Sequence, residues 1–594
     1  MSEPHQTWLD RVKEAERRGE LFTAFDLADR GLEEHPDSVL LQHRAVLSLA
    51  RAGSTREARR RFESYGLATV DDEDVQAVRA RIAKDVALAD RGPGRRSKAR
   101  EAAAMYRRTF ERTGGYYPAV NAATLLLVAG AIAEARQLAE QVLVVLDRED
   151  RDAYWPAATE AEALLVLGRE VDARVALERA AKLHGGDYGA LSTTRRQLRL
   201  ICDETGLDTN LLVAIAGPAV VHYCGHRIRA EADGRFPPEA EPLVRDRVAD
   251  EIAPIRPGFA YGSLASGADI VCAEALLAAG AELHVVLPFA RDEFVRTSVA
   301  DAGEGWAARF DRCLAAATTV TYATEDAYLG DDVLYRYASE LAMGLALLRA
   351  RFLDAPACQL AVWDGRPAGG EAGTAVDVAT WRRTGRPASI VSPGVASPPS
   401  DLRPPRVAAD SRRVVRAMLF TDVKGFSKLS DEQLLRFADH VLGALANVLD
   451  RHDDSISARE TWGDAIYMVV TDAVAAAACA LDLRDAMEAL DWTALQLPAD
   501  LSMRLGGHIG PVFPVRNPIT STQDYMGSHV SRTARIEPVT PPGAVFVTES
   551  FAAALELANS ELACDYVGHL PAAKDYGRLR MYRLDRPLGP RAEV

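Results

Sequence analysis

Two aspartates in the C-terminal third of the chain stand where carboxylates commonly bind metal ions. Asp422 ends an apolar run that leads into Gly425 and Phe426, and Asp464 lies in a Gly-Asp turn between two extended segments of residues 456–470. This pattern predicts a strand end beside a hairpin turn, which brings the two carboxylates together. Such a pair can hold two Mg²⁺ or Mn²⁺ ions about 3.5 to 4 Å apart, which clamp a triphosphate and activate a ribose hydroxyl for in-line attack.

Five segments around these aspartates occur in a specific order. They are FTDVKGFS (420–427), ETWGD (460–464), RLGGHIGPVF (504–513), QDYMGSHVSRTARIEP (523–538) and LPAAKDYGRLRMYRL (570–584). Together they resemble the motifs of class III adenylate and guanylate cyclases. The resemblance implies that residues 412–586 form an α+β, ferredoxin-like domain. Its expected reaction converts a nucleoside triphosphate to a 3′,5′-cyclic nucleotide and pyrophosphate.

The resemblance also implies roles for residues on the metal and phosphate side. Asp422 and Asp464 would ligate the metal ions with help from the Val423 carbonyl, and Gly425 and Phe426 would lie against the phosphates.

Three further residues take roles from the same resemblance. Arg535 would stabilise the charge that develops on the α-phosphate, and Lys574 would neutralise the terminal phosphates. The family's ribose-orienting asparagine falls on Ser531, which is shorter but can still donate a hydrogen bond.

The residues that would select the base do not match either branch of the family. Glu460 corresponds to guanylate cyclases and Asp524 to adenylate cyclases, so the base stays open: ATP comes first by family, with GTP or a pyrimidine nucleotide as alternatives. Trp462 would narrow this pocket. The run from Asp464 to Tyr467 is one residue longer than usual, which predicts a β-bulge there.

Class III cyclase sites form between two catalytic domains, each of which contributes a different half. Because this chain carries both halves, we expect a C2 homodimer and an inactive monomer.

The first 203 residues contain a repeated pattern of a glycine followed by small or apolar residues five and nine positions later. The sets begin at Gly19, Gly53, Gly130 and Gly168. A glycine that ends one helix, followed by small residues four apart on the next, is typical of helical hairpins. The region resembles degenerate tetratricopeptide repeats, which implies an all-α domain that binds a protein partner or supports the other domains.

Residues 204–395 change to short apolar runs separated by helical stretches. We predict strands at 211–217, 282–289, 317–323, 359–365 and 388–394 in a doubly wound, Rossmann-like α/β domain.

Two glycine-rich turns in this domain could present backbone N–H groups to phosphate. Their residues, together with weak candidates nearby, are Gly262, Gly267, Asp269, Glu274, Gly369, Gly370, Gly373, Thr374 and His226. The turns resemble those of SLOG nucleotide-binding domains. Backbone geometry alone explains such glycines equally well, and a sensing role is preferred because no nucleophile elbow is present.

Composition limits the remaining possibilities. A chain of 594 residues requires several domains, and prolines in 396–411 predict a linker before the cyclase-like domain, with a tail at 587–594. The net charge of −15 argues against nucleic acid and membrane surfaces as partners. Seven scattered cysteines and the lack of a long apolar stretch predict a cytoplasmic protein with buried thiols.

We therefore expect a nucleotidyl cyclase regulated by its upstream domains. The alternative is a middle domain that senses or hydrolyses a nucleotide or NAD, with a degenerate cyclase domain that acts as sensor or scaffold.

Overall fold

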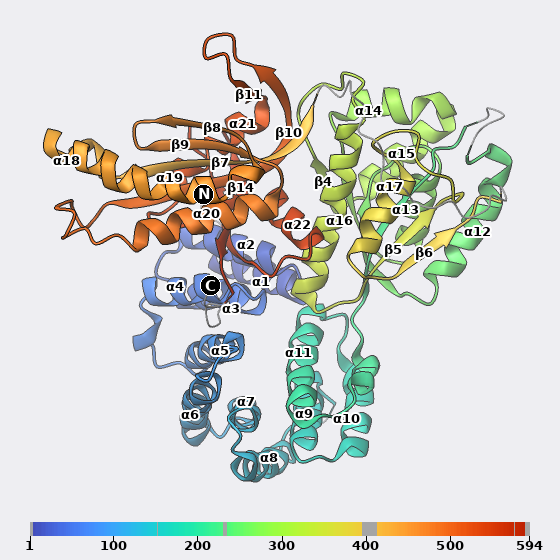
Figure 1. The fold of residues 1–594 in the computed structure, drawn as a ribbon. Coiled ribbons are helices and arrows are strands. Elements are labelled where there is room, and N and C mark those ends of the chain that lie inside the picture. Colours follow the sequence, from blue (N-terminus) through green and yellow to red (C-terminus); the bar gives the residue numbers. More distant parts are fainter. Residues whose placement is uncertain (1–3, 151, 230–234, 395–412, 575, 588–594) are drawn as a thin grey trace.

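The computed structural model describes residues 4–150, 152–229, 235–394, 413–574 and 576–587. Three parts follow one another along the chain (Figure 1): helical repeats, a middle domain with a parallel sheet, and a C-terminal domain with a mixed sheet. The expected fold class is confirmed. The predicted linker at 396–411 and nearly all of the tail lie outside the described residues.

The repeats consist of helices that follow one another with short connections. They are α1 (His5–Arg17), α2 (Leu21–Glu34), α3 (Val39–Arg51), α4 (Thr55–Ser64), α5 (Glu73–Ala89), α6 (Arg95–Thr113), α7 (Tyr116–Val128), α8 (Ile132–Leu146), α9 (Tyr154–Val166), α10 (Glu170–Leu183) and α11 (Tyr188–Thr205).

The glycine pattern marks the hairpin turns, as the sequence predicted. Gly19, Gly53, Gly130 and Gly168 follow α1, α3, α7 and α9, each with a positive φ of 76° to 85°, a conformation that glycine adopts without steric cost. The small residues that follow, such as Ala24 and Ala28 on α2, are fully buried. They let the two helices of each hairpin approach closely.

The middle domain contains a six-stranded, all-parallel sheet in the order β4-β3-β2-β1-β5-β6. Its strands are β1 (Ala219–Gly225), β2 (Pro257–Gly262), β3 (Glu282–Leu287), β4 (Thr319–Tyr322), β5 (Ala357–Val362) and β6 (Ala388–Val391). Its helices are α12 (Glu241–Ile252), α13 (Ala268–Ala278), α14 (Arg291–Ser298), α15 (Glu304–Ala316), α16 (Val333–Leu353) and α17 (Thr374–Arg383).

One predicted strand of this domain is wrong. Residues 211–217 do not form a strand, because Thr209–Ile215 is a 3₁₀ helix and the first strand is Ala219–Gly225. Leu211, Leu212 and Ile215 pack into the core of the repeats, whereas Val213 is exposed. A short apolar run does not distinguish helix from strand, and here the neighbouring helices decide.

The C-terminal domain is built on an eight-stranded mixed sheet in the order β13-β14-β12-β10-β7-β9-β8, with β11 paired to β10. The strands are β7 (Val414–Lys424), β8 (Ile456–Trp462), β9 (Ala465–Val470), β10 (Ser502–Arg516), β11 (Gln523–Met526), β12 (Val545–Thr548), β13 (Ala563–Pro571) and β14 (Arg578–Asp585). The helices are α18 (Asp431–Arg436), α19 (Gly443–Arg451), α20 (Ala473–Glu488), α21 (Ser528–Thr533) and α22 (Glu549–Leu557).

The predicted bulge after Asp464 is absent from the β8–β9 hairpin. Glu460 pairs with Tyr467, Thr461 with Ile466 and Trp462 with Ala465, which is a regular register around a two-residue turn. The register shifts instead between Ile456 and Ala458, at the other end of the hairpin. The β8–β9 irregularity therefore lies at the start of β8, and Gly463-Asp464 forms a tight turn.

The three parts pack against one another (Figure 1). Helix α16 runs between the middle and C-terminal domains and contacts α22, and the N-terminal hairpins lie under the C-terminal sheet. A buried ion pair joins Arg413 to Asp331 at 2.9 Å, and the Tyr566 hydroxyl donates to Asp26 of α2 at 2.8 Å. Changes in one part can therefore reach the others through direct contacts.

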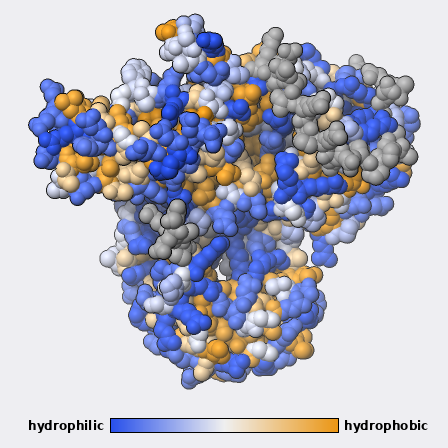
Figure 2. Space-filling view, viewed as in Figure 1, coloured by the Kyte–Doolittle hydropathy of each residue, from blue (hydrophilic) through white to orange (hydrophobic). Residues whose placement is uncertain are grey.

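The surface visible in Figure 2 carries hydrophobic residues in small groups among hydrophilic ones. Among the described residues, no helix combines the length and apolarity needed to cross a membrane. All seven cysteines are free, and six are buried.

Candidate active site

Asp422 and Asp464 lie together because two neighbouring strand segments end at one place. Strand β7 carries Asp422 near its end and pairs antiparallel with β9, which follows the turn that holds Asp464. The Val423 N–H donates to Asp464 Oδ2 at 3.2 Å, and the Ile466 N–H donates to Thr421 Oγ1 at 3.2 Å. These bonds fix the hairpin turn beside the end of β7.

Both carboxylates line a cavity of about 610 Å³, together with Val423, Gly425 and Phe426. Partial burial raises the pKa of Asp464, and the negative charge of Asp422 raises it further. Two carboxylates that repel each other in this way suit a divalent cation, which would relieve the repulsion.

A residue that the sequence analysis did not single out completes this group. Arg504 on β10 stands directly across from Asp422 in the sheet register and forms an ion pair with it. Its Nε also lies 3.0 Å from Glu537 Oε1. Burial raises the pKa of Glu537 to about 7, although Arg504 opposes the shift. Arg504 thus places a positive charge where the two aspartates concentrate negative charge.

Arg535, Ser531 and Lys574 form a separate group. Ser531 is exposed on α21, and the carbonyl of Arg535 accepts a hydrogen bond from the Ala573 N–H at 3.0 Å. This bond holds the turn that presents Lys574 close to the end of α21. Among the residues that the structure describes, none of these three lines the cavity of Asp422 and Asp464.

Glu460 and Asp524, the predicted base-selecting pair, approach each other on β8 and β11 around Tyr467. Burial raises the pKa of Tyr467, and the charges of Asp524 and Glu460 raise it further. The buried Tyr467 hydroxyl has no hydrogen-bond partner among the described residues. Trp462 is 90% exposed at the tip of the hairpin, so within one chain it does not narrow a pocket.

Comparison with protein families assigns this part of the chain. A model described as the adenylate and guanylate cyclase catalytic domain matches residues 410–585. Residues 410–585 are a class III cyclase domain. A second model, Tetratricopeptide Repeats-Sensor, matches residues 21–126 of the repeats. No curated protein matches the chain.

Solved structures similar to this chain include several cyclases. The adenylyl cyclase CyaB from P. aeruginosa is 19% identical, with 31% of this chain and 97% of that chain covered and a TM-score of 0.27. The guanylate cyclase domain of RhGC from Catenaria anguillulae is 18% identical, covering 29% and 97%, with a TM-score of 0.25. A non-canonical dimeric guanylyl cyclase domain of the RhoGC fusion protein from Blastocladiella emersonii is also 18% identical, covering 29% of this chain and 97% of that chain, with a TM-score of 0.25.

Outside the cyclase domain, the predicted glycine turns lie at the carboxyl ends of the middle-domain strands. Gly262 ends β2, Gly267 precedes α13 with a φ of 103°, and Gly373 precedes α17 with a φ of 122°. Thr374 begins α17, and Gly370 lies in the loop before it. Glu274 lies further along α13 and pairs with Arg309 of α15 at 2.7 Å.

A hydrogen-bonded group connects the strand ends of this domain. His226, which follows β1, contacts Asp364 after β5 at 2.9 Å and Thr374 Oγ1 at 3.2 Å. Arg235 donates to Asp364 at 2.9 and 2.6 Å. Burial lowers the pKa of His226, which keeps the imidazole neutral. Because β2 and β5 flank β1, this group sits where the strand order reverses, a usual position for ligands in such sheets.

Proposed function

We propose that the protein converts a nucleoside triphosphate to a 3′,5′-cyclic nucleotide and pyrophosphate. The observation that carries the proposal is the shared cavity of Asp422 and Asp464, at the end of β7 and the β8–β9 turn of a cyclase domain. In the reaction, the ribose 3′-oxygen bonds to the α-phosphorus and loses its proton, while the bond from that phosphorus to pyrophosphate breaks.

Asp422, Asp464 and the Val423 carbonyl would hold two Mg²⁺ or Mn²⁺ ions. When bound, these ions neutralise the triphosphate and lower the pKa of the 3′-hydroxyl. Arg504 would then exchange its pairing with Asp422 for a phosphate oxygen, since a guanidinium suits both anions. Arg535 would stabilise charge at the α-phosphate, Lys574 would pair with the terminal phosphates, and Ser531 would orient the ribose.

Tyr467 would supply a hydrogen-bond donor that the base site otherwise lacks. Glu460 and Asp524 can only accept hydrogen bonds when ionised, whereas adenine N1 and guanine O6 each need a donor. The raised pKa of Tyr467 keeps its hydroxyl protonated. We propose ATP as substrate, with N6 donating to Asp524 and N1 accepting from Tyr467. GTP and pyrimidine nucleotides are the alternatives.

The separation of the groups in one chain supports a homodimer. The aspartates would serve one site, while Arg535, Lys574 and the base residues of the same chain would serve the other. Signals at the repeats or the middle domain would act by changing the geometry of this pair.

The proposal is tested by incubating the purified chain with ATP, GTP, CTP or UTP and Mg²⁺ or Mn²⁺, with cyclic products read by mass spectrometry. We expect cyclic AMP as the main product. Asp464→Ala should lower the rate by at least about 10²-fold, since it removes a proposed ligand of the metal ions that stabilise charge in the transition state. Asp439→Asn, an exposed carboxylate on the same domain, serves as the control. A product that persists in Asp464→Ala would contradict the assignment.

A second function is favoured by the His226, Asp364 and Thr374 group at the switch point of the middle sheet. Its SLOG-like turns would bind a nucleotide or NAD, either as a sensor or as a hydrolase. Incubation with NAD and ATP, compared between wild type and His226→Asn, tests it. A non-cyclic cleavage product that disappears in His226→Asn but persists in Asp464→Ala would make the middle domain the effector.

A further inference from the structure

A cavity of about 720 Å³ lies where all three parts of the protein meet. It is lined by the α1–α2 turn of the repeats, by β2, β3, β4 and α16 of the middle domain, and by residues of the cyclase domain that include Arg532 and Arg580. No residue assigned above to catalysis or substrate binding lines it. A ligand here would contact all three parts at once.

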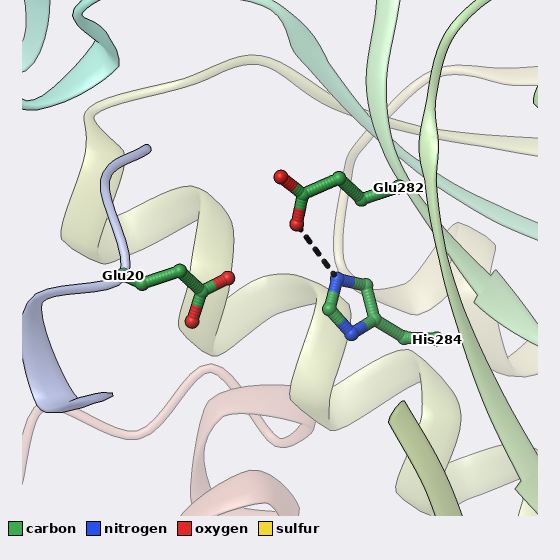
Figure 3. A group of neighbouring side chains, drawn as sticks. All are labelled: Glu20, Glu282 and His284. Carbon is green, nitrogen blue, oxygen red and sulfur yellow. Dashed lines mark ion pairs between the residues drawn. The ribbon is translucent and has the colours of Figure 1, made fainter. Parts of the chain in front are cut away.

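Three side chains with metal-binding atoms lie together beside this cavity (Figure 3), and two of them, Glu20 and His284, line it. Glu20 comes from the turn before α2, and Glu282 and His284 come from the same face of β3. Their ligand atoms all lie within 4.8 Å of one another, and His284 Nε2 is 3.9 Å from Glu282 Oε2. Segments more than 250 residues apart in sequence therefore contribute to one group.

Two of the three residues have a buried atom that lacks a hydrogen-bond partner among the described residues. These atoms are Glu282 Oε2 and His284 Nε2. The distance of 3.9 Å between these two is too long for a hydrogen bond. Buried polar atoms without partners are costly, so two of them facing each other beside the Glu20 carboxylate indicate a missing group.

The imidazole of His284 is held in the orientation that a ligand requires. His284 is 3% exposed, its Nδ1 lies 2.9 Å from Thr319 Oγ1, and its ring stacks on Tyr261 at 4.5 Å. Burial lowers the pKa of His284 to about 3, so the ring is neutral. A hydrogen bond at one ring nitrogen typically orients a metal-binding histidine toward its ion through the other.

Two arginines form ion pairs with the two carboxylates. Arg18 lies 2.8 Å from Glu282 Oε1, which leaves Oε2 directed toward His284. Arg349 lies 2.5 Å from Glu20 Oε1, and its charge lowers the pKa of Glu20 although burial alone would raise it. Neither arginine is paired with Glu282 Oε2 or His284 Nε2, which have no hydrogen-bond partner among the described residues. Their positive charges would weaken the binding of a cation but not prevent it.

We propose that Glu20, Glu282 and His284 bind a divalent transition-metal ion that fastens the helical repeats to the middle domain. One imidazole nitrogen and two carboxylates suit Zn²⁺, Co²⁺, Mn²⁺ or Fe²⁺, whereas Mg²⁺ and Ca²⁺ prefer oxygen ligands alone. Water from the cavity would complete the coordination. Because α16 lines the same cavity, the ion would set the positions of all three parts.

The test uses Co²⁺ as the probe and the full-length chain carrying Asp422→Asn and Asp464→Asn, which removes the proposed catalytic metal site. Metal-free protein is titrated with Co²⁺, followed by visible d–d absorption and by elemental analysis. We expect one Co²⁺ per chain, displaced by Zn²⁺. His284→Asn should abolish this binding. Thr319→Val should weaken Co²⁺ binding about 10-fold, because the contact of Thr319 Oγ1 with His284 Nδ1, which orients the imidazole, is lost.

A matched control is His222→Asn, which replaces another buried histidine of the same sheet and should leave Co²⁺ binding unchanged. Glu282→Gln, nearly identical in shape, provides a second ligand variant if His284→Asn fails to fold, as judged by circular dichroism. Arg18→Ala should strengthen binding by removing a nearby positive charge. Absence of Co²⁺ binding, or equal binding by His284→Asn and Glu282→Gln, would overturn the proposal.

Discussion

Arg504 shows that the contacts of a single residue can depend on its register position in the sheet. In the sequence it is one arginine in an apolar segment, 82 positions from Asp422. The antiparallel pairing of β7 with β10 places it directly across from that aspartate. Asp422 and Asp464 were recognisable because each lies inside a short motif, whereas Arg504 depends on register. Tyr467 is a similar case: Glu460 stands across from it on β8, Asp524 lies on β11, and the charges of both raise its pKa.

Asp269 should make stability depend on pH. Burial raises its pKa to about 7, despite a hydrogen bond from the Ala265 N–H, while the unfolded value is about 3.9. The folded state therefore holds the proton more tightly, so the stabilisation is present below about pH 4 and is lost as the pH rises through about 7. The free energy of unfolding should fall by up to about 1.4 kcal/mol per pH unit in this window.

Asp269→Asn should remove this part of the pH dependence. Calorimetric unfolding at about pH 5 and about pH 8 measures it in wild type and variant. Asp246→Asn, exposed on α12, is the control and should keep the wild-type slope. An unchanged slope in Asp269→Asn would show that this carboxyl is ionised in the folded protein.

At the scale of elements, α16 connects the middle domain to the cyclase domain. A Cβ atom on Gly344 would lie 2.3 Å from the Ala553 carbonyl oxygen of α22, so the two helices can meet only with glycine there. Gly344→Val should lower the free energy of unfolding by about 1 to 3 kcal/mol through overpacking, measured by urea unfolding. Gly443→Val on α19, where no atom lies within 4 Å of the new Cβ, is the control. Equal losses of unfolding free energy in the two variants would show that α16 and α22 are not tightly packed at Gly344.

At the scale of the whole molecule, the separation of the two groups predicts complementation between inactive variants. Asp464→Ala would remove a proposed metal ligand, and Arg535→Ala would remove a residue proposed to stabilise charge at the α-phosphate. In an equal mixture, about half of the dimers combine both chains, and each has one intact site. We expect about a quarter of wild-type cyclase activity, although each variant alone is inactive. The measurement is cyclic nucleotide formation after the chains are mixed and allowed to exchange. No recovery, with dimer exchange verified, would place the whole site within one chain.

The sequence by itself determined what depends on local pattern. The helical hairpins followed from glycines at their turns, the alternation of apolar runs gave the α/β class of the middle domain, and the Asp422 and Asp464 motifs identified the cyclase domain. Tertiary structure decided what depends on distant neighbours. Residues 209–215 form a 3₁₀ helix because the core of the repeats buries one side of it, and the β8–β9 register shifts near Ser457 rather than after Asp464. The convergence of Glu20 with Glu282 and His284 depends on how separate domains pack, which no local pattern encodes.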